Sequence, residues 1–189
     1  DDFAKASFLA SKLALVPGAI KVRETLASGF IMPCFLWASP WFTNPFDLSK
    51  MIFKSIVRTR CNWWCFSRFF ADRIDLHPVY MTAIRGLTTA AGLLHLPSAK
   101  LDFVIGEHAR VLNFSARIAN GHLEVCPLPN TDIRVLNFIN RVHPSRNTND
   151  GFFKVDSGIA PHAFRLAGRC AVLSLIGTDR YKRYDSFGF

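Results

Sequence analysis

The sequence predicts an α+β fold, in which a helical, basic N-terminal half precedes a mainly antiparallel β-sheet with one or two packed helices. Three observations lead to this fold class. The hydrophobic period changes from about 3.6 residues before Pro97-Ser98 to 2 residues after it. Asn120-Gly121 tolerates the positive φ angles of a two-residue hairpin. A near-repeat flanks that pair, at residues 110–118 and 134–142.

The composition limits the size and the partners of the protein. Its 189 residues suffice for one ordinary domain or two small ones. The net charge of +9 favours nucleic acid, anionic lipid or an acidic protein surface as partner. This charge is concentrated early, since residues 3–71 contain only Glu24 and Asp47 as acids. Five cysteines, an odd number, argue against a secreted disulfide framework.

The first elements are a short helix and an uncharged run. Residues 3–16 are rich in Ala, Leu and Ser, and Pro17-Gly18 predicts the end of this helix, which is a packing helix or a targeting-like segment. Residues 27–42 contain no charge but are too short to span a bilayer and contain two prolines. We expect the run to be buried in an assembly or to lie at a membrane interface; a span is the least favoured alternative.

A basic amphipathic helix is predicted over residues 44–71, with Asn44 as its N-cap and Pro45 in its first turn. Its cations are spaced by four residues, and aromatic residues follow them. The helix is either an ordinary surface helix or one that contacts a membrane, an assembly or a phosphate backbone. With the tryptophans of the uncharged run, the predicted lipid- or headgroup-contacting residues are Lys50, Lys54, Arg58, Trp37, Trp41, Trp63 and Trp64.

The remaining elements are predicted in chain order. A helix over 79–96 precedes a strand over 112–118, whose partner is 122–126; residues 133–142 fit a strand and a helix almost equally. A short strand at 152–156, a helix at 159–167 and a strand at 169–176 follow. The predicted regions are thus a helical, membrane- or assembly-facing part (1–98), an α+β domain (99–180) and a basic, aromatic docking tail (181–189).

Candidate catalytic and metal-binding residues are few. Cys61 and Cys65 could share a helix face, but structural zinc sites need four ligands, so we expect no metal there. His108 beside Glu107, and His122 near Glu124, are more simply read as polar strand residues than as acid–base groups. The sequence lacks the glycine-rich nucleotide motifs and the G-x-S-x-G motif. It therefore predicts no enzyme and no cofactor, although a bound phospholipid such as cardiolipin would be compatible.

The C-terminal half, residues 99–180, resembles sterol-carrier-protein-2-like lipid-binding domains. The resemblance rests on the order of five segments: 101–106, the strand after them, 120–125, 132–135 and 161–169. The family's usual ending is only loosely matched by Gly168-Arg-Cys and Gly177-Thr-Asp. The resemblance implies a small α+β fold around an apolar cavity, with a lipid or quinone-type ligand, or the same fold reused as a scaffold.

The expected function is that of a non-enzymatic accessory subunit in a large mitochondrial inner-membrane complex, either of the respiratory chain or of ATP synthase. The high apolar content, the uncharged run and the basic first third favour this function, with other subunits and anionic phospholipid as partners. One alternative is a mitochondrial ribosomal protein that binds rRNA. Another is a lipid-binding domain of the sterol-carrier type.

Overall fold

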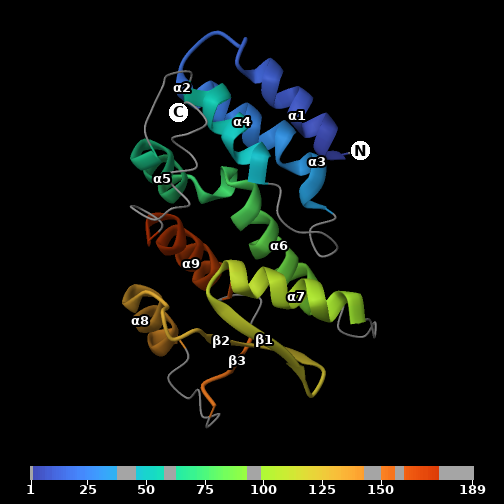
Figure 1. The fold of residues 1–189 in the computed structure, drawn as a ribbon, viewed down its shortest axis with the longest axis vertical. Coiled ribbons are helices and arrows are strands. Elements are labelled where there is room, and N and C mark those ends of the chain that lie inside the picture. Colours follow the sequence, from blue (N-terminus) through green and yellow to red (C-terminus); the bar gives the residue numbers. More distant parts are fainter. Residues whose placement is uncertain are drawn as a thin grey trace. The chain divides into compact units, whose positions relative to one another are not determined.

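The structure, a computed structural model, describes residues 2–37, 46–57, 63–92, 99–142, 150–155 and 160–174. It has the predicted α+β fold, rich in helices and with an antiparallel three-stranded sheet (Figure 1). Contacts divide the chain into an N-terminal unit (Asp1–Trp37, Asn44–Met81 and Val172–Phe189) and a sheet unit (Ala38–Thr43 and Thr82–Ala171). This division lies within α6 (Pro78–Gly92), whereas the sequence suggested a boundary at residue 98.

The N-terminal unit begins with a helical hairpin. Helix α1 (Asp2–Leu13) confirms the first predicted helix, and Gly18 with a φ of 103° lies in the turn that follows. The chain returns through α2 (Ile20–Leu26), η1 (Ala27–Ile31) and α3 (Pro33–Leu36). Phe3 at the start of α1 stacks on Phe35 near the end of α3, with 5.4 Å between ring centroids. The two arms of the hairpin are therefore antiparallel.

Proline explains the irregular turn in the second arm. η1 is a π-helix, and the N–H of Met32 donates to the carbonyl of Ala27 over 3.0 Å. A proline ring inside a regular α-helix clashes with the carbonyl four residues earlier, here that of Gly29. The wider π turn just before Pro33 relieves this clash.

Within the described residues, every helix is too short or too polar to span a membrane.

The core of the N-terminal unit lies where α4 (Phe46–Val57) packs against α1 and α2 (Figure 1). Leu48, Ile52, Phe53 and Ile56 are buried on one side of α4. The helix predicted over 44–71 corresponds to α4 and α5 (Trp63–Asp72); residues 58–62 and the predicted cap residues Asn44 and Pro45 lie outside the described part. After α5 come η3 (Ile74–Leu76) and α6, which matches the predicted helix over 79–96 as far as Gly92; residues 93–96 lie outside the described part.

The sheet unit is built around the predicted hairpin. β1 (Phe114–Ala119) pairs antiparallel with β2 (His122–Pro127), and β3 (Phe153–Lys154) pairs antiparallel with β2. Asn120 and Gly121 have φ angles of 52° and 72°, as a type I′ turn requires. The hairpin and the short third strand are thus confirmed.

Helix α7 (Ala99–Val111) corrects the prediction of period-2 structure directly after Pro97-Ser98. Residues 99–111 form a helix, and the strand predicted from residue 112 begins only at Phe114. Asn113 ends the helix with a φ of 59°, a conformation that asparagine tolerates better than most residues. Its carbonyl then accepts the backbone N–H of Leu128, which ties the start of β1 to the end of β2.

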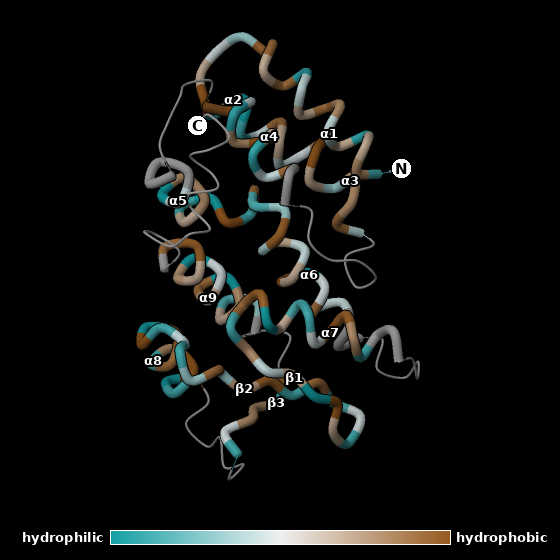
Figure 2. The backbone as a smooth tube through the Cα atoms, in the orientation of Figure 1, coloured by the Kyte–Doolittle hydropathy of each residue, from teal (hydrophilic) through white to brown (hydrophobic). Residues whose placement is uncertain are grey.

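The second copy of the near-repeat is the helix α8 (Ile133–Val142), which confirms the helix alternative for this segment and not the strand. The Asp132 carboxylate accepts the backbone N–H of Arg134 at 2.8 Å and caps this helix, a contact that a strand would not make. Val135 and Ile139 are buried one helical turn apart. Hydrophilic and hydrophobic residues consequently alternate along the turns of α8 (Figure 2).

Helix α9 (Ala160–Ser174) confirms the predicted helix over 159–167 but extends beyond it. The strand predicted over 169–176 is wrong for its described residues, which continue α9 to Ser174. Helical spacing explains this, because a buried stripe runs along α9 through Ala163, Phe164, Ala167, Cys170 and Ala171. The ring of Phe164 packs edge-on against Phe114 of β1, with 5.6 Å between centroids.

Candidate functional site

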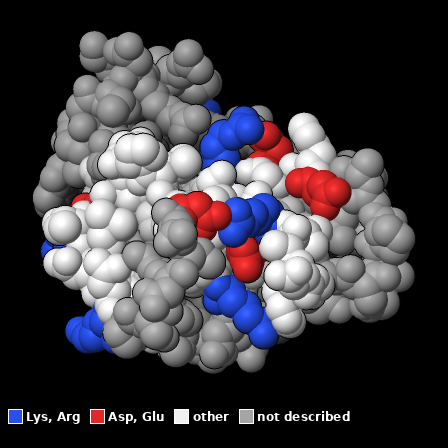
Figure 3. All heavy atoms as spheres, turned by 90° about the horizontal axis from the view of Figure 1, so that it is seen from below, with Lys and Arg blue, Asp and Glu red and all other residues white. Residues whose placement is uncertain are grey.

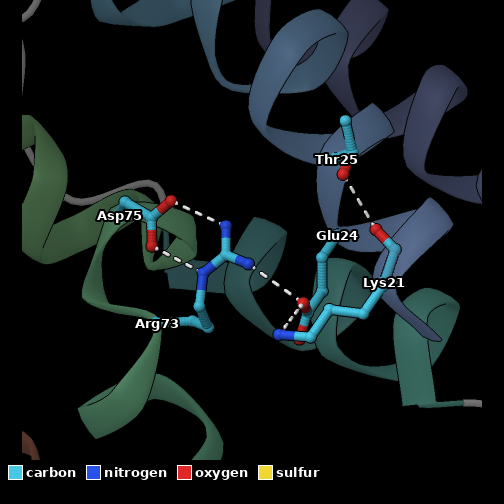
Figure 4. Close-up of polar contacts among 5 residues, drawn as sticks. All are labelled: Lys21, Glu24, Thr25, Arg73 and Asp75. Carbon is cyan, nitrogen blue, oxygen red and sulfur yellow. Dashed lines mark hydrogen bonds and ion pairs between the residues drawn. The ribbon is translucent and has the colours of Figure 1, made fainter.

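Among the described residues of the N-terminal unit, a group of four charged side chains surrounds Arg73, just before η3 (Figure 4). Its guanidinium donates to both carboxylate oxygens of Asp75, at 3.0 and 2.9 Å. A third nitrogen donates to Glu24 of α2 at 3.0 Å. The Lys21 ammonium lies 3.3 Å from the same Glu24 oxygen. The cluster therefore joins α2 to the segment between α5 and η3.

This charge cluster is balanced, since two cations face two carboxylates. The Glu24 side chain is only 8% exposed, so leaving it without a cation would carry a large desolvation cost. The hydrogen bond to Asp75 raises the pKa of Arg73, although partial burial opposes the shift, and attraction to Asp75 and Glu24 adds to it. Because its charges cancel within the cluster, we interpret the cluster as a structural clamp.

Arg23 is a second buried cation that sequence reasoning missed. Its side chain donates to the carbonyl of Ile56 at 2.8 Å and to that of Gly18 at 2.7 Å. Ile56 belongs to the last turn of α4, whose carbonyls have no partner within the helix. A cation there also opposes the negative end of the helix dipole. Arg23 thus stabilises the end of α4 and is withdrawn from external ligands, since it is only 4% exposed.

The predicted lipid-contacting residues are only partly described. Lys50 is half-buried and Lys54 exposed on α4, whereas Trp37 is exposed and follows α3, a separate element. The Trp37 indole donates to the carbonyl of Cys34 at 3.2 Å. Arg58 and Trp41 lie outside the described residues, as do the side chains of Trp63 and Trp64 at the start of α5.

The apolar side of the predicted basic helix forms part of the core of the N-terminal unit. Ile52, Ile56 and Phe70 are completely buried in the N-terminal unit. Phe70 and Phe53 pack with ring centroids 6.2 Å apart, and Phe69 completes this aromatic cluster. These side chains already pack in the core, so they are not available to a membrane while the unit is folded.

Exposed apolar side chains lie instead on the helical hairpin. Its exposed fractions are 60% for Phe8, 75% for Leu15, 66% for Phe30 and 71% for Trp37. Lys5 and Lys12 are exposed on α1, and the Lys12 ammonium lies 5.3 Å from the centroid of the Phe8 ring. We define the α1–α3 surface by the exposed lysines and the exposed large apolar residues of the hairpin, together with Pro33: Lys5, Phe8, Lys12, Leu15, Ile20, Lys21, Val22, Phe30, Pro33 and Trp37. Among them, the sequence predicted a lipid contact only for Trp37, although Phe8 between Lys5 and Lys12 on α1 was a readable signal.

Arg117 is the centre of a group of charges in the sheet unit. Arg117 of β1 donates to Glu124, its cross-strand neighbour, at 2.8 Å and to Asp150 at 2.6 Å. Its guanidinium also lies 3.9 Å from the centroid of the Phe152 ring. On the face seen in Figure 3, acidic and basic side chains accordingly lie beside one another. That face offers no patch of one sign among the described residues.

The two candidate acid–base histidines have different surroundings. His122 is an exposed strand residue, as expected. The expectation that His108 is a polar strand residue was wrong, because it lies on α7 and is 1% exposed. A Cβ placed on Gly86 of α6 would lie 2.4 Å from its imidazole ring. His108 is therefore packed into a helix crossing.

The cysteines give no assembled site in the described residues. Cys61 and the side chain of Cys65 lie outside those residues, so the C-x3-C pair is not described. Cys34, Cys126 and Cys170 have free thiols, and burial raises the pKa of Cys170. In the part of the chain that the structure describes, no three His, Cys, Asp or Glu residues are grouped so as to hold a metal ion.

Comparison with protein-family models, curated proteins and solved structures found no match.

Proposed function

We propose that this protein is a non-enzymatic accessory subunit of a large mitochondrial inner-membrane complex, where it docks on neighbouring subunits and lipid. The observation that carries the proposal is the α1–α3 surface. Four large apolar side chains on it, Phe8, Leu15, Phe30 and Trp37, are each at least 60% exposed. Apolar surface of this kind, interspersed with lysines, is typical of regions that contact a partner or a membrane.

The use of the charged groups also supports a docking role. In the N-terminal unit Arg23, Glu24 and Arg73 hold helices together, as clamps and caps. In the sheet unit Arg117 joins the hairpin to Asp150. Such contacts produce rigid elements that present a surface. The mitochondrial inner membrane is the proposed site because a basic protein suits its anionic lipid, and the net charge here is +9.

The other two functions predicted from the sequence have less support. The sterol-carrier reading requires an apolar cavity enclosed by the C-terminal half, and Phe114, Phe164, Leu123 and Val125 of that half are packed core residues. The ribosomal reading requires a patch of cations for phosphates, whereas on the face seen in Figure 3 the described cations lie beside carboxylates. We retain rRNA binding as an outcome that the following experiment would detect.

The experiment is purification of the tagged full chain from mitochondria solubilised in a mild detergent. We expect the chain to migrate in native gels and density gradients with a membrane complex far larger than its own 21.3 kDa. Nuclease treatment should leave this migration unchanged. Migration with ribosomal subunits that nuclease abolishes, or migration as a free 21.3 kDa chain, would contradict the proposal.

A further inference from the structure

We infer that the α1–α3 surface binds the surface of an anionic phospholipid bilayer, with lysines at the headgroup phosphates and aromatic side chains at headgroup depth. This inference rests on the proposed function and names the partner of that surface. It moves the predicted lipid contact from the basic helix over 44–71 to the helical hairpin. The described apolar side chains of that basic helix are largely buried, whereas those of the hairpin are exposed.

The first arm of the hairpin has two distinct sides. Ala6, Ala10 and Leu13 of α1 are buried at helical spacing, and α1 packs there against α4 and α3. Lys5, Phe8 and Lys12 lie at i, i+3 and i+7, which places them together on the opposite side. The outer side of α1 thus carries two cations around one exposed aromatic ring. Long lysine side chains can reach phosphate oxygens while their methylene groups lie along apolar surface.

The second arm adds apolar side chains without charge. Residues 25–37 contain no charged side chain. Phe30, Pro33 and Trp37 are exposed at i, i+3 and i+7, while Ile31 and Phe35 between them are buried. A tryptophan beside a charge-free apolar strip suits the boundary between headgroups and acyl chains. This arm therefore supplies the apolar part of the contact.

The balance of exposed charge selects an anionic partner. Of the charged residues between 2 and 37, Arg23 and Glu24 are buried. The exposed ones are Asp2, Lys5, Lys12 and Lys21. Lys21 is paired with Glu24, so Lys5 and Lys12 stand against Asp2, and the uncompensated exposed charge is 2 − 1 = +1. A lysine at an anionic membrane surface favours binding by about fivefold. Lipid fits better than RNA because Leu15, which is 75% exposed, has no ring on which a base could stack, whereas burial in a bilayer favours aliphatic and aromatic side chains alike.

The test is co-flotation of the purified full chain with vesicles of phosphatidylcholine alone or of phosphatidylcholine with cardiolipin. We expect preferential binding to the cardiolipin vesicles, weakened by salt. Lys5→Gln with Lys12→Gln should reduce that binding by about 30-fold. Phe8→Ser with Phe30→Ser should reduce binding to both vesicle types by about tenfold. All four positions are exposed or at the surface of a helix, so circular dichroism should report a retained fold.

Two matched controls come from the sheet unit. Lys154→Gln with Arg165→Gln removes the same charge from exposed positions, and Phe103→Ser with Ile133→Ser removes similar apolar side chains that are 67% and 64% exposed. Both pairs should bind vesicles like the wild type. Equal losses in the controls would overturn the inference, as would binding to RNA in place of vesicles. If vesicle binding fails while the chain still migrates with a membrane complex, a protein subunit covers this surface; the inference then falls and the proposed function stands.

Discussion

At the scale of single residues, burial decides the state of the titratable groups. His77, between η3 and α6, is 3% exposed and packs edge-on against the rings of Phe70 and Tyr80, both with centroids 4.6 Å away. Burial lowers the pKa of His77 from 6.5 to about 3, because the apolar surroundings disfavour the imidazolium. The folded protein therefore keeps His77 neutral at pH values where the unfolded chain binds a proton.

This difference predicts a loss of stability in mild acid. Between pH 6.5 and about 3 the unfolded state binds the extra proton, so the free energy of unfolding falls as the pH decreases. From pH 7 to pH 4.5 the loss from His77 should be about 2–3 kcal/mol, and His77→Phe should remove it. Urea unfolding at the two pH values measures this contribution. The exposed His122→Gln variant should follow the wild type, and an unchanged pH dependence in His77→Phe would contradict the assignment.

The charge cluster around Arg73 permits a second prediction at this scale. Arg73→Met leaves the carboxylate of Glu24, which is 8% exposed, without its guanidinium partner. We expect the free energy of unfolding to fall by about 1–3 kcal/mol, because Glu24 then keeps only the exposed Lys21 as a cation and Asp75 loses its guanidinium partner. Arg68→Met breaks only the exposed 3.9 Å pair with Asp72 and should cost under about 0.5 kcal/mol. Similar losses in the two variants by chemical denaturation would refute the clamp.

At the scale of elements, one glycine sets the distance between two helices of the sheet unit. Gly86 of α6 faces the imidazole of His108 on α7, and an added Cβ would lie 2.4 Å from that ring. Gly86→Ala should therefore destabilise the protein by about 1–3 kcal/mol despite the better helix propensity of alanine. Gly106→Ala on α7 meets nothing within 4 Å and should stabilise by about 0.5–1 kcal/mol. Thermal unfolding of both variants decides this, and the opposite order would exclude the close crossing.

At the scale of the whole molecule, the distribution of apolar residues matters more than their number. Half of the sequence is apolar, and both units bury a core. Among the described residues, six of the nine exposed large hydrophobic side chains belong to residues 8–37, and the other three lie in the sheet unit. The vesicle and complex-migration experiments therefore test a surface of the N-terminal unit within the intact chain, with the sheet unit as the internal reference.

Local signals in the sequence determined several elements of this protein. Asn120-Gly121 predicted the hairpin correctly, because a two-residue type I′ turn needs positive φ angles that few other pairs adopt. The Ala- and Leu-rich start predicted α1, and Pro17-Gly18 marked its end. These features depend on residues close in the chain, so the sequence alone contains their physical cause.

Only the tertiary structure decided which secondary structure each copy of the near-repeat forms and which residues meet in the candidate sites. The same five residues, RVLNF, end α7 and start β1 in one copy but form α8 in the other. In the first copy, Asn113 adopts a positive φ and ends the helix, whereas in the second copy the Asp132 carboxylate caps the start of a helix. Contacts between distant residues also lie beyond local patterns. Glu24 and Arg73 are 49 residues apart, and whether Phe70 or Phe8 faces solvent depends on which helix packs against it.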